Sequence, residues 1–157
     1  PQAESYAALV KNTARLNNVS THQVALGAVP QAKAPFSVVP WNYGASFLGT
    51  DPQWATETVT VTTLDTLLAD VPRLDFIHLD AEGMELHILR GATQLIERFH
   101  PPLLLEMTER WLARYGSSPA ALLEQLRAWG YPTVHKIQSD PEWFDIVAVY
   151  QGVAVSA

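Results

Sequence analysis

The chain has 157 residues, of which 48% are hydrophobic, and this predicts one compact domain with a sizeable core. The formal charge of −6 gives no basic surface, so neither nucleic acid nor an anionic membrane is expected as a partner. The lack of cysteine excludes disulfides, thiolate catalysis and Cys-based zinc sites. No apolar run is long enough to span a membrane, and together these features favour a cytoplasmic protein.

The first half of the chain is expected to alternate helices with short strands. Apolar residues at helical spacing predict a helix over 6–16, and a short strand is expected over 22–26. Residues 28–56 show no periodicity but are rich in proline, glycine and aromatic residues, which predicts a loop or small insertion that covers a site. Alternating Val and Thr predict a strand over 58–62, and a short helix follows over 64–68.

The second half alternates strands and helices more regularly. We expect a strand over 76–79, a helix over 84–99, a strand over 103–107, a helix over 119–129, and strands over 133–137 and 144–150. The apolar run at 76–79 is expected to be buried on both faces. This order predicts an α/β fold with a mainly parallel sheet, helices on both faces and an antiparallel last strand. Gly91, in the middle of the 84–99 helix, is expected to allow close packing.

Carboxylates gather directly after the apolar run that ends at Leu79. Asp80 follows the predicted strand, and Glu82 and Glu85 lie at the start of the next helix, on either side of Gly83. Ligands bind at this edge of open α/β sheets, so at least one of the three is expected to face a ligand. The alternative is that they only cap the helix, since the helix dipole stabilises carboxylates in its first turn.

Asp80 is the strongest candidate for a catalytic residue, with a turn-stabilising role as its alternative. A carboxylate in this position can hold an acceptor hydroxyl or act as a general base. Glu82 could do the same from the first helical turn. Glu85 is expected at an exposed helix position, with substrate binding as its weaker reading. Gly83 is expected where the backbone turns tightly or where a ligand approaches closely.

An ordered set of motifs covers the middle of the chain. The segments are Thr63-Leu64-Asp65, then Asp75-Phe76-Ile77-His78-Leu79-Asp80-Ala81-Glu82-Gly83-Met84-Glu85, then Leu89-Arg90-Gly91-Ala92, then Pro102-Leu103-Leu104-Leu105-Glu106. This set resembles the FkbM family of S-adenosylmethionine-dependent methyltransferases, which carries T-L-D followed by D-x-I-K-I-D-x-E-G-x-E-x-x-x-L-x-G-A. His78 stands where the family usually has Lys, and a histidine satisfied within the core is the expected reading.

The resemblance extends from residue 1 to about residue 150 and implies a Rossmann-like class I methyltransferase fold. It implies S-adenosylmethionine as the cofactor and O-methylation of a hydroxyl on a small molecule, often a sugar or polyketide. It also implies that Ala25 and Leu26 lie near the adenine ring and that they contact the cofactor together with Asp80. Asn42 and Ser46 belong to a region similar to the family's N-x-G-x-S segment and are expected to bind the substrate.

Glu106 ends the strand that follows the carboxylate cluster. Neighbouring strands lie about 4.8 Å apart, so Glu106 is expected on the same sheet edge as Asp80. Asp80, Glu82 and Glu106 are therefore predicted to be the catalytic residues, converging beside the loop at 42–46. Their carboxylates are similar in type to a hard-cation site, but methyl transfer requires no metal and none is predicted.

The first strand, glycine-rich loop and second strand of the family have no counterpart in this sequence. Residues 1–157 are therefore expected to form a single but incomplete methyltransferase-like domain, and to bind S-adenosylmethionine weakly by themselves. The resemblance places the missing strands between those at 22–26 and 76–80, which would leave unpaired edges. Two alternatives stay open: a catalytically inactive fragment or paralogue that retains the fold, and another Rossmann-like enzyme that uses a nucleotide cofactor.

Overall fold

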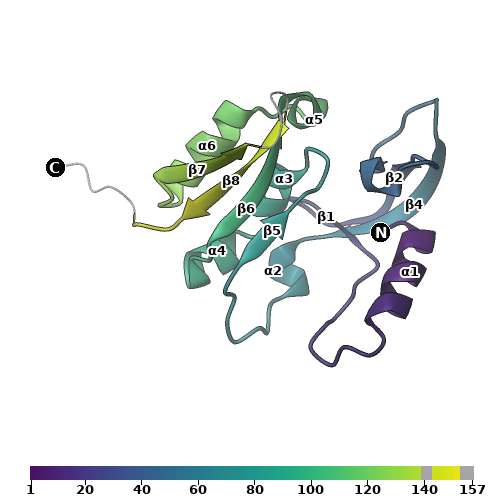
Figure 1. The fold of residues 1–157 in the computed structure, drawn as a ribbon, viewed down its shortest axis with the longest axis horizontal. Coiled ribbons are helices and arrows are strands. Elements are labelled where there is room, and N and C mark those ends of the chain that lie inside the picture. Colours follow the sequence, from purple (N-terminus) through teal and green to yellow (C-terminus); the bar gives the residue numbers. More distant parts are fainter. Residues whose placement is uncertain (139–142, 153–157) are drawn as a thin grey trace.

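The computed structural model describes residues 1–138 and 143–152 (Figure 1). In this part of the chain the strands form two four-stranded sheets, ordered β1-β4-β2-β3 and β5-β6-β8-β7. The elements in chain order are α1 (Ala3–Thr13), β1 (Ala25–Leu26), β2 (Gln31–Val38), η1 (Tyr43–Ala45), β3 (Phe47–Leu48), β4 (Ala55–Thr62), α2 (Leu64–Leu67), β5 (Ile77–Leu79), α3 (Glu85–Arg90), α4 (Thr93–Phe99), β6 (Leu103–Thr108), α5 (Glu109–Arg114), α6 (Pro119–Ala128), β7 (Thr133–Gln138) and β8 (Trp143–Val149). The predicted α/β class is confirmed.

The first sheet is built on the long antiparallel pair of β2 and β4. Val38 lies opposite Ala55 at one end of this pair, while β1 joins β4 in parallel. Residues 28–56 are therefore not one continuous loop, because β2 takes up eight of them, and the alternative of a small insertion stays a prediction. Burial along β2 does not alternate cleanly, and Pro35 lies within the strand, so the local sequence gives no clear strand pattern. The partner strand β4 lies about twenty residues further along the chain.

The second sheet combines one parallel pair with two antiparallel pairs. β5 runs parallel to β6, while β8 lies antiparallel to both β6 and β7. The predicted antiparallel pairing of the last two strands is confirmed. The expectation of one mainly parallel sheet is wrong, since each sheet holds a single parallel pair. Parallel neighbours require crossover connections, and the chain from β2 to β4 instead turns back on itself.

β5 is buried on one face only. Ile77 and Leu79 belong to the main core, whereas Phe76, just before the strand, is 50% exposed and His78 is also exposed. The predictions of burial on both faces and of a core histidine at His78 are therefore wrong. The physical reason is the two-residue period of a strand, which places His78 on the face opposite to that of Ile77 and Leu79.

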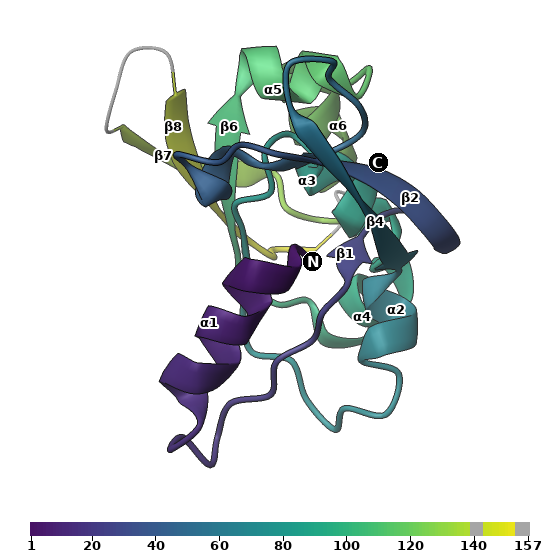
Figure 2. The same cartoon turned by 90° about the vertical axis from the view of Figure 1, so that its right-hand side faces the viewer.

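Helices α3 to α6 pack on one face of the second sheet and α1 does not, so the expectation of helices on both faces is wrong for this sheet. Buried side chains such as Leu89, Leu112 and Leu126 join β5, β6 and β8 in one core. Figures 1 and 2 show α1 standing away from this sheet, and none of its residues is buried. No helix in the described residues is both long and apolar enough to cross a membrane.

The predicted helix over 84–99 is divided in two at Gly91 and Ala92. α3 ends at Arg90, and α4 begins at Thr93. The close packing expected at Gly91 is confirmed, because a Cβ there would lie 2.1 Å from the carbonyl oxygen of Gly27. Gly91 therefore allows the backbone after α3 to meet the backbone that follows β1.

Candidate functional site

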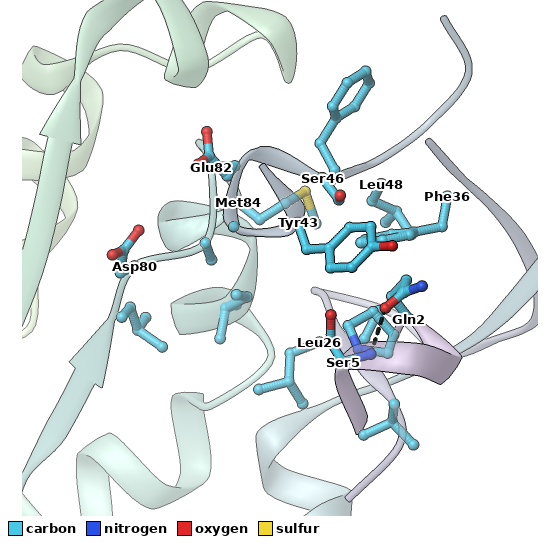
Figure 3. Close-up of a pocket in the computed structure, with 18 of the residues that line it drawn as sticks. Gln2, Ser5, Leu26, Phe36, Tyr43, Ser46, Leu48, Asp80, Glu82 and Met84 are labelled. Atoms are coloured by element: carbon cyan, nitrogen blue, oxygen red, sulfur yellow. Dashed lines mark hydrogen bonds between the residues drawn. The ribbon is translucent and has the colours of Figure 1, made fainter. Parts of the chain in front are cut away.

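A cavity of about 370 Å³ lies between the two sheets (Figure 3). Asp80 and Glu82 border it from the segment after β5, and Ser46 and Leu48 from the region of β3. Leu26 of β1 contributes a third part of the wall. Figure 3 shows Asp80 on one side, with Glu82 and Met84 between it and the side chains of the first sheet. The site is therefore assembled from segments that are far apart in the sequence.

A tight turn presents Glu82 to this cavity. The N–H of Met84 donates to the carbonyl oxygen of Ala81 at 3.1 Å, which closes the turn around Glu82 and Gly83. Both central residues have positive φ, +52° at Glu82 and +97° at Gly83. A Cβ on Gly83 would lie 2.2 Å from the carbonyl oxygen of Trp111. The glycine predicted to serve a backbone turn is confirmed in that role, and it also allows α5 to approach.

Glu85 lies underneath the same turn. Its side chain has no exposed surface, and its Oε1 accepts hydrogen bonds from the N–H groups of Ala81 at 2.8 Å and Gly83 at 3.4 Å. The exposed helix position expected for Glu85 is wrong. Its placement also argues against the predicted substrate contact, because the residue does not line the cavity. A carboxylate at the start of α3 folds back onto the turn, where backbone N–H groups need acceptors.

The electrostatics of the site are dominated by carboxylates. Burial raises the pKa of Glu82 to about 7, and the negative charges of Glu106 and Asp80 add to this effect while Arg114 opposes it. Burial followed by repulsion from Asp80 raises the pKa of Glu106, although a hydrogen bond from the Thr108 hydroxyl at 3.2 Å partly offsets the shift. Glu82 is thus a carboxyl group that holds its proton into the neutral range.

Asp80 and Glu106 lie close enough to Glu82 for their negative charges to raise its pKa. The convergence of all three carboxylates on one edge as catalytic residues stays a prediction. Asp80 and Glu82 line the cavity, whereas Glu106 does not. Among the described residues, no group of three or more His, Cys, Asp or Glu side chains is arranged to hold a metal ion.

The other predicted residues divide into two groups. Ala25, Leu26 and Ser46 line the cavity, so the structure brings them together with the carboxylates. Ser46 is buried, and its Oγ accepts a hydrogen bond from the Val39 N–H at 3.1 Å. Asn42 is exposed and does not line the cavity. The functional roles assigned to all of these residues stay predictions.

Sequence reasoning missed part of the wall. Gln2 and Ser5 at the start of α1 line the cavity, and so does His78. The two-residue period of the strand could have placed His78 on the same face as Asp80. No local signal could have found Gln2 and Ser5, because their position depends on contacts such as the hydrogen bond from the Gln2 amide to Glu57 of β4.

Comparisons with known proteins show the family of this chain and a structure with a similar fold. A family profile described as the methyltransferase FkbM domain matches residues 1–133. The crystal structure of methyltransferase FkbM from Methylobacillus flagellatus KT is similar, with a TM-score of 0.54, 19% identity and 94% of this chain covered. The chain spans about a third of that protein, since the match covers 33% of its length. Comparison with curated proteins gives no match.

Proposed function

The chain belongs to the FkbM methyltransferase family, and from its site we propose that it serves S-adenosylmethionine-dependent O-methylation of a small-molecule or sugar hydroxyl. The observation that carries the proposal is the state of Glu82. This carboxylate lines the cavity, its Oε2 is buried without a hydrogen-bond partner in the described structure, and its pKa is raised to about 7. These are the properties of a general base.

A general base works best when its pKa lies near the operating pH. Glu82 then exists partly as the carboxylate at neutral pH, yet binds a proton strongly enough to remove it from a hydroxyl. A hydroxyl bound in the cavity that donates to the carboxylate of Glu82 would give up its proton to that carboxylate as its oxygen accepts the methyl group from the sulfonium. Asp80, which is exposed beside it, contributes negative charge and a second acceptor.

The remaining lining fits a methyl donor that carries a flat aromatic ring and a positively charged sulfur. Cavities of about 300–1,000 Å³ are typical of small-molecule sites, and this one lies within that range. Ala25, Leu26 and Met84 offer apolar surface to an adenosine group, and Asp80 offers a charge that offsets a sulfonium. When bound, S-adenosylmethionine supplies an activated methyl group, so the protein mainly aligns the acceptor oxygen.

The acceptor side of the site is formed by the region around η1. Ser46 receives a backbone N–H on its Oγ, which leaves its own proton available to an acceptor oxygen. Ser46 is therefore better placed for the predicted substrate contact than the exposed Asn42. The chemistry of the lining disfavours an anionic acceptor, because the described lining residues include two carboxylates and neither lysine nor arginine.

The first test replaces the proposed base in the full-length protein. Glu82→Gln keeps the size of the side chain but cannot take a proton, and removal of a general base lowers turnover by about 10²–10⁴-fold. The measurement is release of S-adenosylhomocysteine from S-adenosylmethionine with a panel of hydroxylated sugars. The wild-type rate should rise with pH around 7, as Glu82 loses its proton.

Two further variants accompany this test, one as a control and one as a test of Asp80. Glu97→Gln makes the same change on the exposed surface of α4 and should leave turnover unchanged. Asp80→Asn should lower turnover while the circular dichroism spectrum stays that of the wild type. If Glu82→Gln turns over as fast as Glu97→Gln, the role of Glu82 as base is wrong, and an unchanged Asp80→Asn returns Asp80 to a turn residue.

A second experiment measures how tightly residues 1–157 bind the methyl donor by themselves. β1 and β5 border the cavity, and each pairs with a single strand within the described residues. We expect weak binding in a calorimetric titration with S-adenosylmethionine, because residues 1–157 hold no counterpart of the glycine-rich loop that the family resemblance implies for the donor. Micromolar binding by the isolated monomer would contradict this expectation.

A further inference from the structure

One carboxylate oxygen holds the backbone on both sides of Glu82. Oε1 of Glu85 accepts hydrogen bonds from the N–H of Ala81 at 2.8 Å and from the N–H of Gly83 at 3.4 Å. These two amides immediately precede and follow Glu82 in the chain. Glu85 itself is the first residue of α3 and is fully buried, so its side chain is fixed by the core.

The backbone of Glu82 requires this support. Its φ of +52° lies in the left-handed region, which residues with a Cβ adopt only when the surroundings impose it. Gly83 follows at φ +97° and packs against the backbone of Trp111, so α5 blocks the turn from one side. Glu85 blocks it from below. The turn therefore has little freedom to take an extended conformation that would carry Glu82 out of the cavity.

We propose that Glu85 is a positioning residue for methyl transfer, which holds the turn so that the carboxylate of Glu82 lies in the cavity. This inference rests on the proposed function, in which Glu82 is the general base. It also gives a reason for an acidic side chain in the core: a buried carboxylate is costly unless hydrogen bonds compensate it, and the two amides of the turn supply them. Burial raises the pKa of Glu85, and its Oε2 lacks a partner among the described residues.

A matched pair of substitutions separates hydrogen bonding from packing. Glu85→Gln keeps an acceptor oxygen for the two amides, whereas Glu85→Met fills a similar volume without one. Both are compared in the full chain by amide hydrogen exchange at Ala81 and Gly83. The ionisation of Glu82 is followed by the ¹³C shift of its carboxyl carbon against pH. Glu97→Met, on the exposed face of α4, is the control for the substitution itself.

We expect the wild-type carboxyl of Glu82 to titrate near pH 7, the value its raised pKa implies. Glu85→Gln should retain slow exchange at both amides and shift this midpoint by less than about half a unit. In Glu85→Met, exchange at Ala81 and Gly83 should accelerate by about tenfold or more. The titration midpoint of Glu82 should fall by about one pH unit or more, because its carboxylate becomes more exposed to water.

The outcomes separate this inference from the proposed function. Wild-type exchange rates and an unchanged Glu82 midpoint in Glu85→Met would overturn the positioning role. If Glu85→Met does not fold, the wild type provides the test, because Ala81 and Gly83 amides that exchange as fast as unprotected amides show that Glu85 does not hold the turn and overturn the role equally. A wild-type Glu82 that titrates as an ordinary glutamate instead contradicts the general base, and the exchange rates alone then decide the role of Glu85.

Discussion

The two sheets meet at the cavity but are packed in different ways. Helices α3 to α6 cover one face of β5-β6-β8-β7 and share with it an extensive core. The sheet β1-β4-β2-β3 has a small cluster of its own, formed by Ala34, Phe36, Val38, Val59 and Val61. The carboxylates of the site follow β5 or belong to β6, in the better packed region. The less packed region supplies the opposite wall, so its position relative to the carboxylates depends on a few contacts between the sheets.

These contacts come from the chain segments around α3 and α5. The Tyr115 hydroxyl donates to the carbonyl oxygen of Leu48 at 2.8 Å, and the guanidinium of Arg114 lies 3.7 Å from the ring centre of Phe47. Gly91 meets the backbone of Gly27. The well packed sheet therefore holds the carboxylates of the site, while these contacts set the distance to the opposite wall of the cavity.

The largest expected effect tests the difference in packing directly. Leu105→Ala removes a fully buried side chain from the core of the second sheet and should lower the free energy of unfolding by about 2–5 kcal/mol. Val61→Ala in the smaller cluster removes fewer atoms and should cost about 2 kcal/mol or less. Urea denaturation measures both. Equal losses would contradict the difference, because Val61→Ala removes fewer atoms and would then lose more stability for each atom removed.

The second prediction concerns the contact between the sheets at Gly91. Gly91→Ala places a Cβ against the carbonyl oxygen of Gly27, and forced overpacking costs about 1–3 kcal/mol. The unfolding transition should also broaden, because the two regions lose part of their coupling. Gly44→Ala is the control, since its Cβ would meet only the Asn42 side chain at 3.3 Å. A Gly91→Ala protein as stable as Gly44→Ala would show that the sheets do not depend on this approach.

The third prediction follows from the raised pKa of Glu82, about 7 in the folded protein against an ordinary value of 4.5. Between these pH values the folded state keeps a proton that the unfolded chain has lost, so stability falls as pH rises. Glu82→Gln does not titrate and should reduce this loss by about 1–2 kcal/mol, a value lowered for the partial exposure of the side chain. Urea denaturation at pH 4.5 and pH 8 measures the difference. An identical decline in both proteins would place the pKa of Glu82 near its ordinary value.

The smallest expected effect comes from the hydrogen bond between α5 and β3. Tyr115→Phe removes the donor to the Leu48 carbonyl and should lower the free energy of unfolding by about 0.5–1.5 kcal/mol. Tyr6→Phe loses a longer bond, 3.4 Å to the carbonyl of Thr21, on a helix with no buried residue, and is the matched control. If both variants unfold alike, the Tyr115 bond does not contribute to holding the sheets together.

Local features of the sequence predicted several elements correctly. Thr63 and Ser118 cap α2 and α6 by accepting from the N–H groups of Thr66 and Ala121, as their positions before helices suggest. The parts that failed depend on distant partners. β2 has no clear signal in the local sequence because its hydrogen-bond partners lie in β4. The break between α3 and α4 at Gly91 depends on the close approach of the Gly27 backbone.

The candidate site shows the same division at the level of single residues. The order Asp80, Glu82, Gly83 and Glu85 is sufficient to place a turn and carboxylates at the end of a strand. This order could not predict that Glu82 lines the cavity whereas Glu85 is buried beneath the turn. The direction of each side chain depends on the positive φ at Glu82 and on the amides that Glu85 accepts.

The sequence by itself thus determined the α/β class, the antiparallel last strands and the family, because periodicity, caps and motifs act over a few residues. Only the tertiary structure decided that the strands form two sheets, that α1 contributes Gln2 and Ser5 to the cavity, and that the pKa of Glu82 is raised. Pairing, burial and the fields of neighbouring charges depend on groups that are remote in the chain, and no local pattern encodes their distances.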